Sequence, residues 1–177
     1  RMSRRVEHVI VHHTGDGERA CWSFEECRRY LRHTQRHYQN RKQFPDIPWN
    51  FLISENGEVF EGMGWGVEGY HTENWNDRSL GIAFIGDFDE QAATRRAMHA
   101  FVQLLECGVR NGYLDSYYGI YGHRDMRDTD CPGDMLYEAI RHMKAFRQYG
   151  GKKIFDVALI ERSESANATS SANNFSA

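Results

Sequence analysis

The chain has 177 residues, which fits one domain better than two and is long enough to bury a hydrophobic core. It carries 22 Lys and Arg against 25 Asp and Glu, for a formal net charge of −3, and 40% of its residues are hydrophobic. The sequence has no apolar run long enough to span a membrane. It also lacks the cluster of basic residues that binding to nucleic-acid phosphates requires. We therefore expect no membrane span and no nucleic-acid partner.

The first forty residues predict a strand followed by a helix. Val6–His12 is β-branched and mostly apolar, which is typical of a strand buried on both faces, and it ends in polar residues. Ser23 followed by Glu26 forms a capping box, which should open a helix. An apolar helical face continues from there to Tyr38, and we expect the helix to end near Asn40.

The middle of the chain predicts a hairpin, a long loop and a buried strand. Segments 49–53 and 58–61 flank Asn56-Gly57, a strong hairpin signal in which both turn positions need positive φ. Residues 62–79 hold four glycines and two tryptophans without a clear period, so we expect a loop whose aromatic side chains lie at a surface groove. Residues 80–85 are apolar throughout and indicate another buried strand.

The remainder predicts a helix, a strand and a helix. Apolar spacing from Met98 to Val109 marks the first helix, residues 117–121 form a short strand, and a last helix extends through Phe146. This order of elements favours an α/β fold in which helices pack on a mixed sheet. We expect one domain over residues 1–151, followed by a polar, low-complexity tail over residues 152–177 that is mobile.

The polar segment GHRDMRDTDCPG, residues 122–133, is the most informative stretch for chemistry. It contains His123 and Cys131, which are both zinc ligand types, although the spacing also fits a solvated loop with one buried cysteine. A catalytic zinc site keeps three protein ligands and an open fourth position, so a third ligand is needed. His12, at the end of the first strand, is able to supply it.

Two further cysteines flank the start of the first helix. Cys21 and Cys27 are either a disulfide, which would indicate an oxidising compartment, or two reduced cysteines of which one belongs to the core. Their spacing leaves both readings open.

Several motifs together resemble one known family. VIVHHT, PDIPWNFLISENGEVFEGMGWGVEGYHT, SLGIAFIGDF and GHRDMRDTDCPG are similar, in order and spacing, to the peptidoglycan recognition proteins, relatives of zinc-dependent type 2 N-acetylmuramoyl-L-alanine amidases. The resemblance covers roughly residues 6–148. It implies a mostly parallel, mixed sheet flanked by helices, with a ligand groove above it. It also implies a Cys21–Cys27 disulfide and a zinc ion held by His12, His123 and Cys131.

The activity implied by the resemblance is binding of bacterial peptidoglycan and hydrolysis of its lactyl–L-alanine amide by zinc-activated water. Thr129 occupies the place of a residue that assists catalysis in the amidases. Trp49 stands where the family shows a catalytic tyrosine, and an indole donates one hydrogen bond but accepts none. The alternative is therefore an innate-immune receptor that binds muramyl peptide without cleaving it and signals through partner chains.

The resemblance also indicates which side chains contact the ligand. His37 and His71 match histidines that line the family's groove, and Trp65 and Tyr70 add aromatic surface for sugar and peptide. Met63 stands where relatives that favour diaminopimelate-type stems often carry arginine, so lysine-type or unselective binding is expected. A secreted protein that dimerises on binding ligand completes these expectations.

Overall fold

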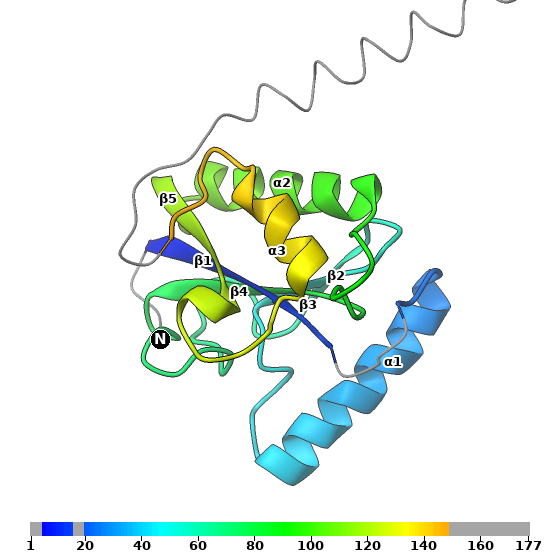
Figure 1. The fold of residues 1–177 in the computed structure, drawn as a ribbon. Helices are drawn as coiled ribbons and strands as arrows, with labels where there is room; N and C mark the ends of the chain where they lie inside the picture. Colours follow the sequence, from blue (N-terminus) through cyan, green and yellow to red (C-terminus); the bar gives the residue numbers. More distant parts are fainter. Residues whose placement is uncertain (1–4, 16–19, 149–177) are drawn as a thin grey trace, which may run out of the picture.

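The computed structural model describes residues 5–15 and 20–148, and within them five strands form one sheet in the order β3-β2-β4-β1-β5 (Figure 1). Neighbouring strands are parallel except for the antiparallel β2–β3 hairpin. The predicted α/β fold with a mixed, mostly parallel sheet is therefore confirmed. The strands are β1 (Val6–His13), β2 (Phe51–Ile53), β3 (Val59–Glu61), β4 (Ser79–Phe84) and β5 (Leu114–Gly122).

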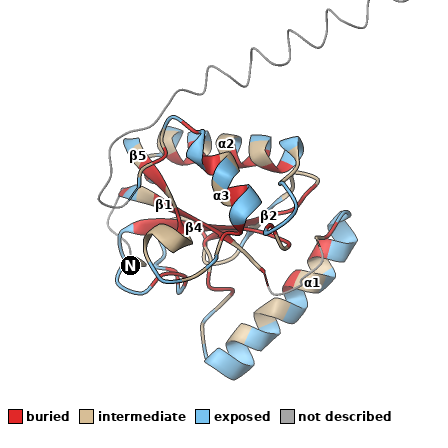
Figure 2. Ribbon diagram, in the orientation of Figure 1, coloured by how far each residue is buried: buried red, intermediate tan, exposed pale blue. Residues whose placement is uncertain are grey.

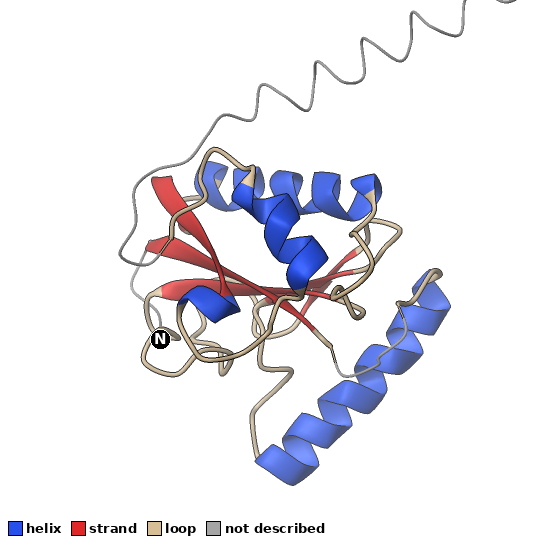
Figure 3. Cartoon of the chain, viewed as in Figure 1, coloured by secondary structure: helices blue, strands red, loops and turns tan. Residues whose placement is uncertain are grey.

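The helices lie on both faces of this sheet. Helices α2 (Arg95–Arg110) and α3 (Asp134–Arg141) cover one face, and α1 (Phe24–His37) lies on the other (Figure 3). Side chains of a strand point alternately to the two faces. In β4, Ile82 and Phe84 accordingly join the apolar cluster under α2 and α3, while Ala83 joins the smaller cluster under α1. This explains why the strand is apolar throughout its length.

The predicted start of α1 is confirmed with one change of partner. Ser23 is the N-cap, and its Oγ accepts a hydrogen bond from the Glu26 N–H at 3.3 Å. The Glu26 carboxylate accepts from the N–H of Trp22 at 2.9 Å, one residue before the N-cap. Cys21 and Cys27 form a disulfide and are both buried, so the bridge implied by the resemblance is present.

The helix continues beyond its expected end as a π-helical turn. This turn spans Tyr38–Lys42 and stops at Gln43, whose φ of 56° is left-handed. Tyr38 is half-buried here, whereas the preceding His37 is exposed.

The β2–β3 hairpin is present, but the expected tight turn is wrong. Ile53 pairs with Val59, so five residues, 54–58, connect the strands. Gly57 has a φ of 84°, whereas Asn56 is not left-handed as a type I′ turn requires. A Cβ at Gly57 would also come within 2.9 Å of the Arg96 carbonyl oxygen, so the approach of α2 requires glycine at this place.

The last helix is shorter than its apolar spacing predicted. α3 ends at Arg141, and Met143 and Phe146 are buried in tight turns that follow it. Phe146 bridges to Ile120, whose N–H donates to the Ala145 carbonyl at 2.8 Å. This pairing with β5 replaces the last helical turns. The predicted tail, residues 152–177, lies outside the described residues.

Candidate metal centre and cleft

Three side chains of the types that commonly bind zinc meet at the edge of the sheet where the parallel strands end. His12 lies near the end of β1 and is 2% exposed, His123 directly follows β5, and Cys131 lies in the loop before α3. Because β1 and β5 are parallel neighbours, their carboxyl ends lie at the same edge. One ligand-type atom from each of the three residues lies within 4.8 Å of the others. The structure thus brings the sequence-predicted trio together.

The geometry and charge of this trio fit a zinc ion. The Cys131 Sγ lies 3.7 Å from the His12 Nδ1, and a tetrahedral zinc places such a pair roughly 3.6 Å apart. Burial, aided by neighbouring histidines, holds the pKa of His12 well below its usual value. Burial, with a contribution from Arg127, lowers the pKa of His123 to about 4. Both imidazoles are therefore neutral at neutral pH, which is the form that binds a metal.

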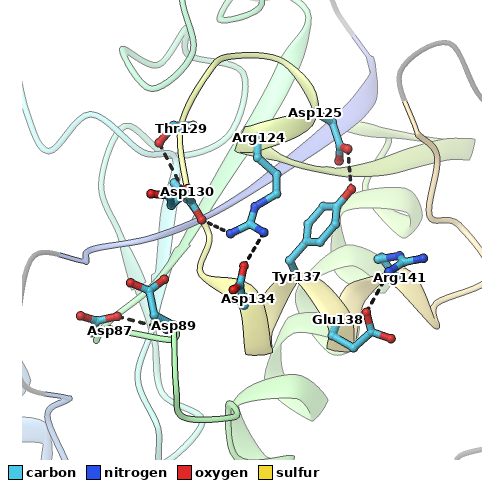
Figure 4. A network of polar contacts seen from close by, with 11 residues as sticks. Asp87, Asp89, Arg124, Asp125, Thr129, Asp130, Asp134, Tyr137, Glu138 and Arg141 are labelled. Atoms are coloured by element: carbon cyan, nitrogen blue, oxygen red, sulfur yellow. Dashed lines mark hydrogen bonds and ion pairs between the residues drawn. The ribbon is translucent and has the colours of Figure 1, made fainter.

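A polar network holds the loop that carries His123 and Cys131 (Figure 4). The backbone N–H of Arg124 donates to the Cys131 carbonyl at 2.9 Å, which ties the two ends of the loop together. The Arg124 guanidinium donates to Asp134 at 2.6 Å and to the Asp130 carbonyl, and it lies 4.8 Å from the Tyr137 ring centroid. The loop is thereby fixed to the start of α3.

Asp125 and Tyr137 form the second half of this network. The Tyr137 hydroxyl donates to Asp125 at 2.6 Å, and the Gly122 N–H donates to the same carboxylate at 2.7 Å. Burial, followed by the bond to Asp125, raises the pKa of Tyr137 to about 12, so the hydroxyl remains a donor. Sequence reasoning did not find this network, and its signal was the alternation of arginine and aspartate through the loop.

A cleft of about 410 Å³ lies beside the trio. Tyr38, Trp49 and Tyr70 give it aromatic walls, and the Trp49 ring centroid lies 6.2 Å from that of His12. Tyr38 packs edge-on against Trp49 at 6.0 Å, and Phe44 stacks on Tyr70 at 4.6 Å. Tyr70 is 47% exposed, so part of this wall is open to a ligand.

Only some of the predicted ligand contacts lie in this cleft. Thr129 and His71 line it together with Trp49 and Tyr70. His37 does not line it, and the neighbouring Tyr38, which sequence reasoning did not propose as a ligand contact, takes that place.

Two more predicted contacts also lie away from the cleft lining. Trp65 packs against Phe51 and Tyr113 with ring centroids 4.5 and 5.1 Å away, which gives it a role in the core under α2. Met63 is adjacent to the cleft wall without lining the cleft: its backbone N–H donates to the carbonyl of Trp49 at 3.0 Å.

Asn50 positions the loop that follows the hairpin, and sequence reasoning missed it. Its side chain is fully buried and donates to the carbonyls of Gly64 and Val67, both at 2.9 Å. Its Oδ1 accepts from the Gly81 N–H in β4, also at 2.9 Å. The only signal in the sequence was an amide inside an otherwise apolar run.

Comparison with known proteins identifies the family. The family model for N-acetylmuramoyl-L-alanine amidase matches residues 2–134. The chain is 40% identical over 149 residues to peptidoglycan recognition protein 1 of Mus musculus. This alignment covers 84% of this chain and 81% of the relative. The chain belongs to the peptidoglycan recognition protein family.

Solved structures of other peptidoglycan recognition proteins have the same fold. The Drosophila protein PGRP-SA superposes with a TM-score of 0.79 at 35% identity, over 88% of this chain and 87% of that one. Peptidoglycan recognition protein LE, in complex with tracheal cytotoxin, a monomeric diaminopimelic acid-type peptidoglycan, gives a TM-score of 0.82 at 30% identity, over 85% and 88%. In the described part of this peptidoglycan recognition domain, each helix is too short or too polar to cross a membrane.

Proposed function

We propose that the protein binds the muramyl peptide of bacterial peptidoglycan in the cleft and hydrolyses the amide between the lactyl group and L-alanine. The main support for this proposal is that the potential metal-binding atoms of His12, His123 and Cys131 converge beside an aromatic cleft. A protein that only binds muramyl peptide does not require three zinc donors at one point. The relative bound to tracheal cytotoxin supports the class of ligand.

Each polar residue has a defined part in this proposal. His12, His123 and Cys131 would hold zinc, which when bound supplies the Lewis acidity that makes hydroxide available near neutral pH. Thr129 accepts a hydrogen bond from the Cys131 N–H at 3.2 Å, which orients its side chain beside the metal ligands. Its hydroxyl proton remains for donation to the oxyanion that develops on the substrate, and such donors are worth roughly 10²–10³ in rate.

Trp49 sets the expected rate. Its indole N–H can donate to the oxyanion, but it lacks the hydroxyl that a tyrosine would place beside the cleft. We expect Trp49→Tyr to accelerate hydrolysis ten-fold or more, a change of at least ~1.4 kcal/mol in the barrier. The measurement is the rate of product release from a defined muropeptide. An unchanged rate would show that the missing hydroxyl is not limiting.

The deciding experiment combines metal analysis with product detection. We expect about one zinc per chain in undialysed protein, and release of the stem peptide from peptidoglycan. Cys131→Ser should weaken zinc binding because it removes the softest ligand. Cys107→Ser, at the other cysteine outside the disulfide, is the matched control and should keep the metal. Protein that holds no stoichiometric metal would contradict the hydrolase proposal.

The second candidate is a receptor that senses muramyl peptide without cleaving it. Trp49 favours it, because the tyrosine expected at this place is missing. Muropeptide binding without product release from zinc-loaded protein would support this candidate. Secretion and a role in innate immunity belong to both candidates, and the ligand-induced dimer stays a prediction.

We also propose lysine-type or unselective binding, based on Met63. A methionine lacks the guanidinium that could pair with the extra carboxylate of diaminopimelate, and losing such a charged contact costs about 1.5–3 kcal/mol. Titration of matched lysine-type and diaminopimelate-type muropeptides tests this proposal. A preference of ten-fold or more for the diaminopimelate form would overturn it.

A further inference from the structure

We propose that His71 is a positioning residue that orients the metal ligand His12, rather than a direct contact for peptidoglycan. The inference rests on the zinc site of the proposed function. His71 is only 8% exposed, so little of its surface is available to a ligand in the cleft. Its Nδ1 lies 3.1 Å from the His12 Nε2, and the two rings meet edge-on with centroids 5.0 Å apart.

The protons on the two rings give this contact a direction. The His12 Nδ1 faces Cys131, so Nδ1 is the nitrogen turned toward the metal position and Nε2 is turned away from it. A neutral imidazole that coordinates through Nδ1 keeps its proton on Nε2, where the proton needs an acceptor. His71 Nδ1 is that acceptor. The hydroxyl of Thr72 lies beside both rings: its Oγ1 is 3.0 Å from His71 Nδ1 and 3.4 Å from His12 Nε2.

Two glycines make room for the His71 ring. A Cβ at Gly81 would come within 2.3 Å of His71 Cδ2, and a Cβ at Gly69 within 2.6 Å of the same atom. Gly81 pairs with Ile10 in the strand that carries His12, so the ring packs directly over the junction of β1 and β4. The backbone N–H of His71 is also held, by Asn76 Oδ1 at 2.9 Å.

Fold stability alone does not account for an imidazole at this place. The His71 Nε2 is buried and has no hydrogen-bond partner among the described residues. A buried polar atom without a partner lowers stability, so an apolar side chain would serve the fold better. The contact with His12 is what the imidazole provides. An imidazole acceptor, unlike a carboxylate, orients His12 without bringing a negative charge to the metal.

The test measures zinc affinity by competition with a chelator of known affinity, and the ligand field by the absorption spectrum of the cobalt-substituted protein. His71→Ala should lower zinc affinity about 10- to 100-fold while the stoichiometry stays at one, and should shift the cobalt bands. His71→Asn keeps an acceptor oxygen near the Nδ1 position and should restore most of the affinity. His99→Ala, an exposed histidine on α2, is the matched control and should bind zinc as the wild type does.

A second variant keeps the test decisive if His71→Ala does not fold. Gly81→Ala retains the imidazole but displaces it, and should lower zinc affinity in the same direction. The inference is overturned if wild-type protein binds zinc while His71→Ala and Gly81→Ala bind it equally well. It is also overturned if His71→Ala binds zinc as the wild type does and loses only its affinity for muramyl peptide, measured in zinc-free protein. Wild-type protein that binds no zinc would instead overturn the proposed function, and this inference with it.

Discussion

The two faces of the sheet are put to different uses. On the face under α2 and α3, apolar side chains form the larger core, and the inward sides of these helices are coloured as buried in Figure 2. The smaller core lies under α1, and the cleft adjoins it. Strand β1 serves both. Val9 and Val11 belong to the larger core, and His12, which points the other way, belongs to the candidate metal centre. Within this one strand, side chains on one face thus stabilise the fold, and a side chain on the other face belongs to the candidate site.

The largest expected effect comes from the face that is all core. Phe101 on α2 is completely buried in the larger cluster. Phe101→Ala should lower the free energy of unfolding by about 3–5 kcal/mol, because it leaves a cavity that the packed surroundings fill only in part. Urea unfolding measures the loss, and zinc per folded chain should not change. A folded variant that had lost its zinc would break the separation of the two faces.

A smaller effect is expected on the α1 face, from the disulfide. Replacing Cys21 and Cys27 by alanine should cost about 2 kcal/mol, because the bridge closes a short loop in the unfolded chain. Hydrogen exchange should become faster in α1 and stay unchanged in α2. Equal acceleration in both helices would show that the two cores unfold as one unit.

Tyr137 connects the two regions, because α3 carries it and its hydroxyl donates to Asp125 in the loop of the candidate metal centre. Tyr137→Phe leaves the half-buried Asp125 without that donor and should cost about 1 kcal/mol of stability. It should also weaken zinc binding, since the loop carries His123 and Cys131. Unfolding and chelator competition measure the two effects. Tyr113→Phe serves as the control, and a variant whose zinc affinity equals that of the wild type would show that the loop holds its shape without the tyrosine.

The smallest effect is expected at Glu55, beside the start of α2. Burial raises the pKa of its carboxyl group, and one of its oxygens has no partner among the described residues. A pKa raised by folding means that the native state disfavours the charged form, so this group costs stability as pH rises above its usual value of 4.5. Glu55→Gln keeps an acceptor for the Thr94 N–H.

We therefore expect Glu55→Gln to raise the melting temperature slightly at pH 7 and to leave it unchanged below pH 4.5. Thermal scans at several pH values measure the difference, with the exposed Glu68→Gln as control. A gain that is equal at low and neutral pH would assign the effect to packing instead of charge.

Local patterns predicted the elements well, and the reason is visible in particular residues. The β-branched run of β1 and the Ser23 cap depend only on neighbouring residues, so the sequence contains their whole cause. His12, His123 and Cys131 were candidates because histidine and cysteine are zinc ligand types, and the family resemblance selected them as a set. Asn50 and Arg124 were missed because their partners come from distant segments or from backbone atoms, which residue types do not reveal. Tyr38 was missed as a cleft residue because helical spacing assigned it to the apolar face of α1, and spacing alone does not show that this face reaches the cleft at its last turn.

The central place of β1 also constrains how the chain acquires its fold. This first strand pairs with β4 and with β5, and His12 approaches a cysteine 119 residues later. Such long-range parallel pairing forms slowly, because a long loop must close before any contact compensates the lost chain entropy. Until residues near 131 have been synthesised and docked, the three donors cannot meet. Binding of a metal by these three residues, as proposed above, would therefore require that the strands and the loop before α3 have already come together.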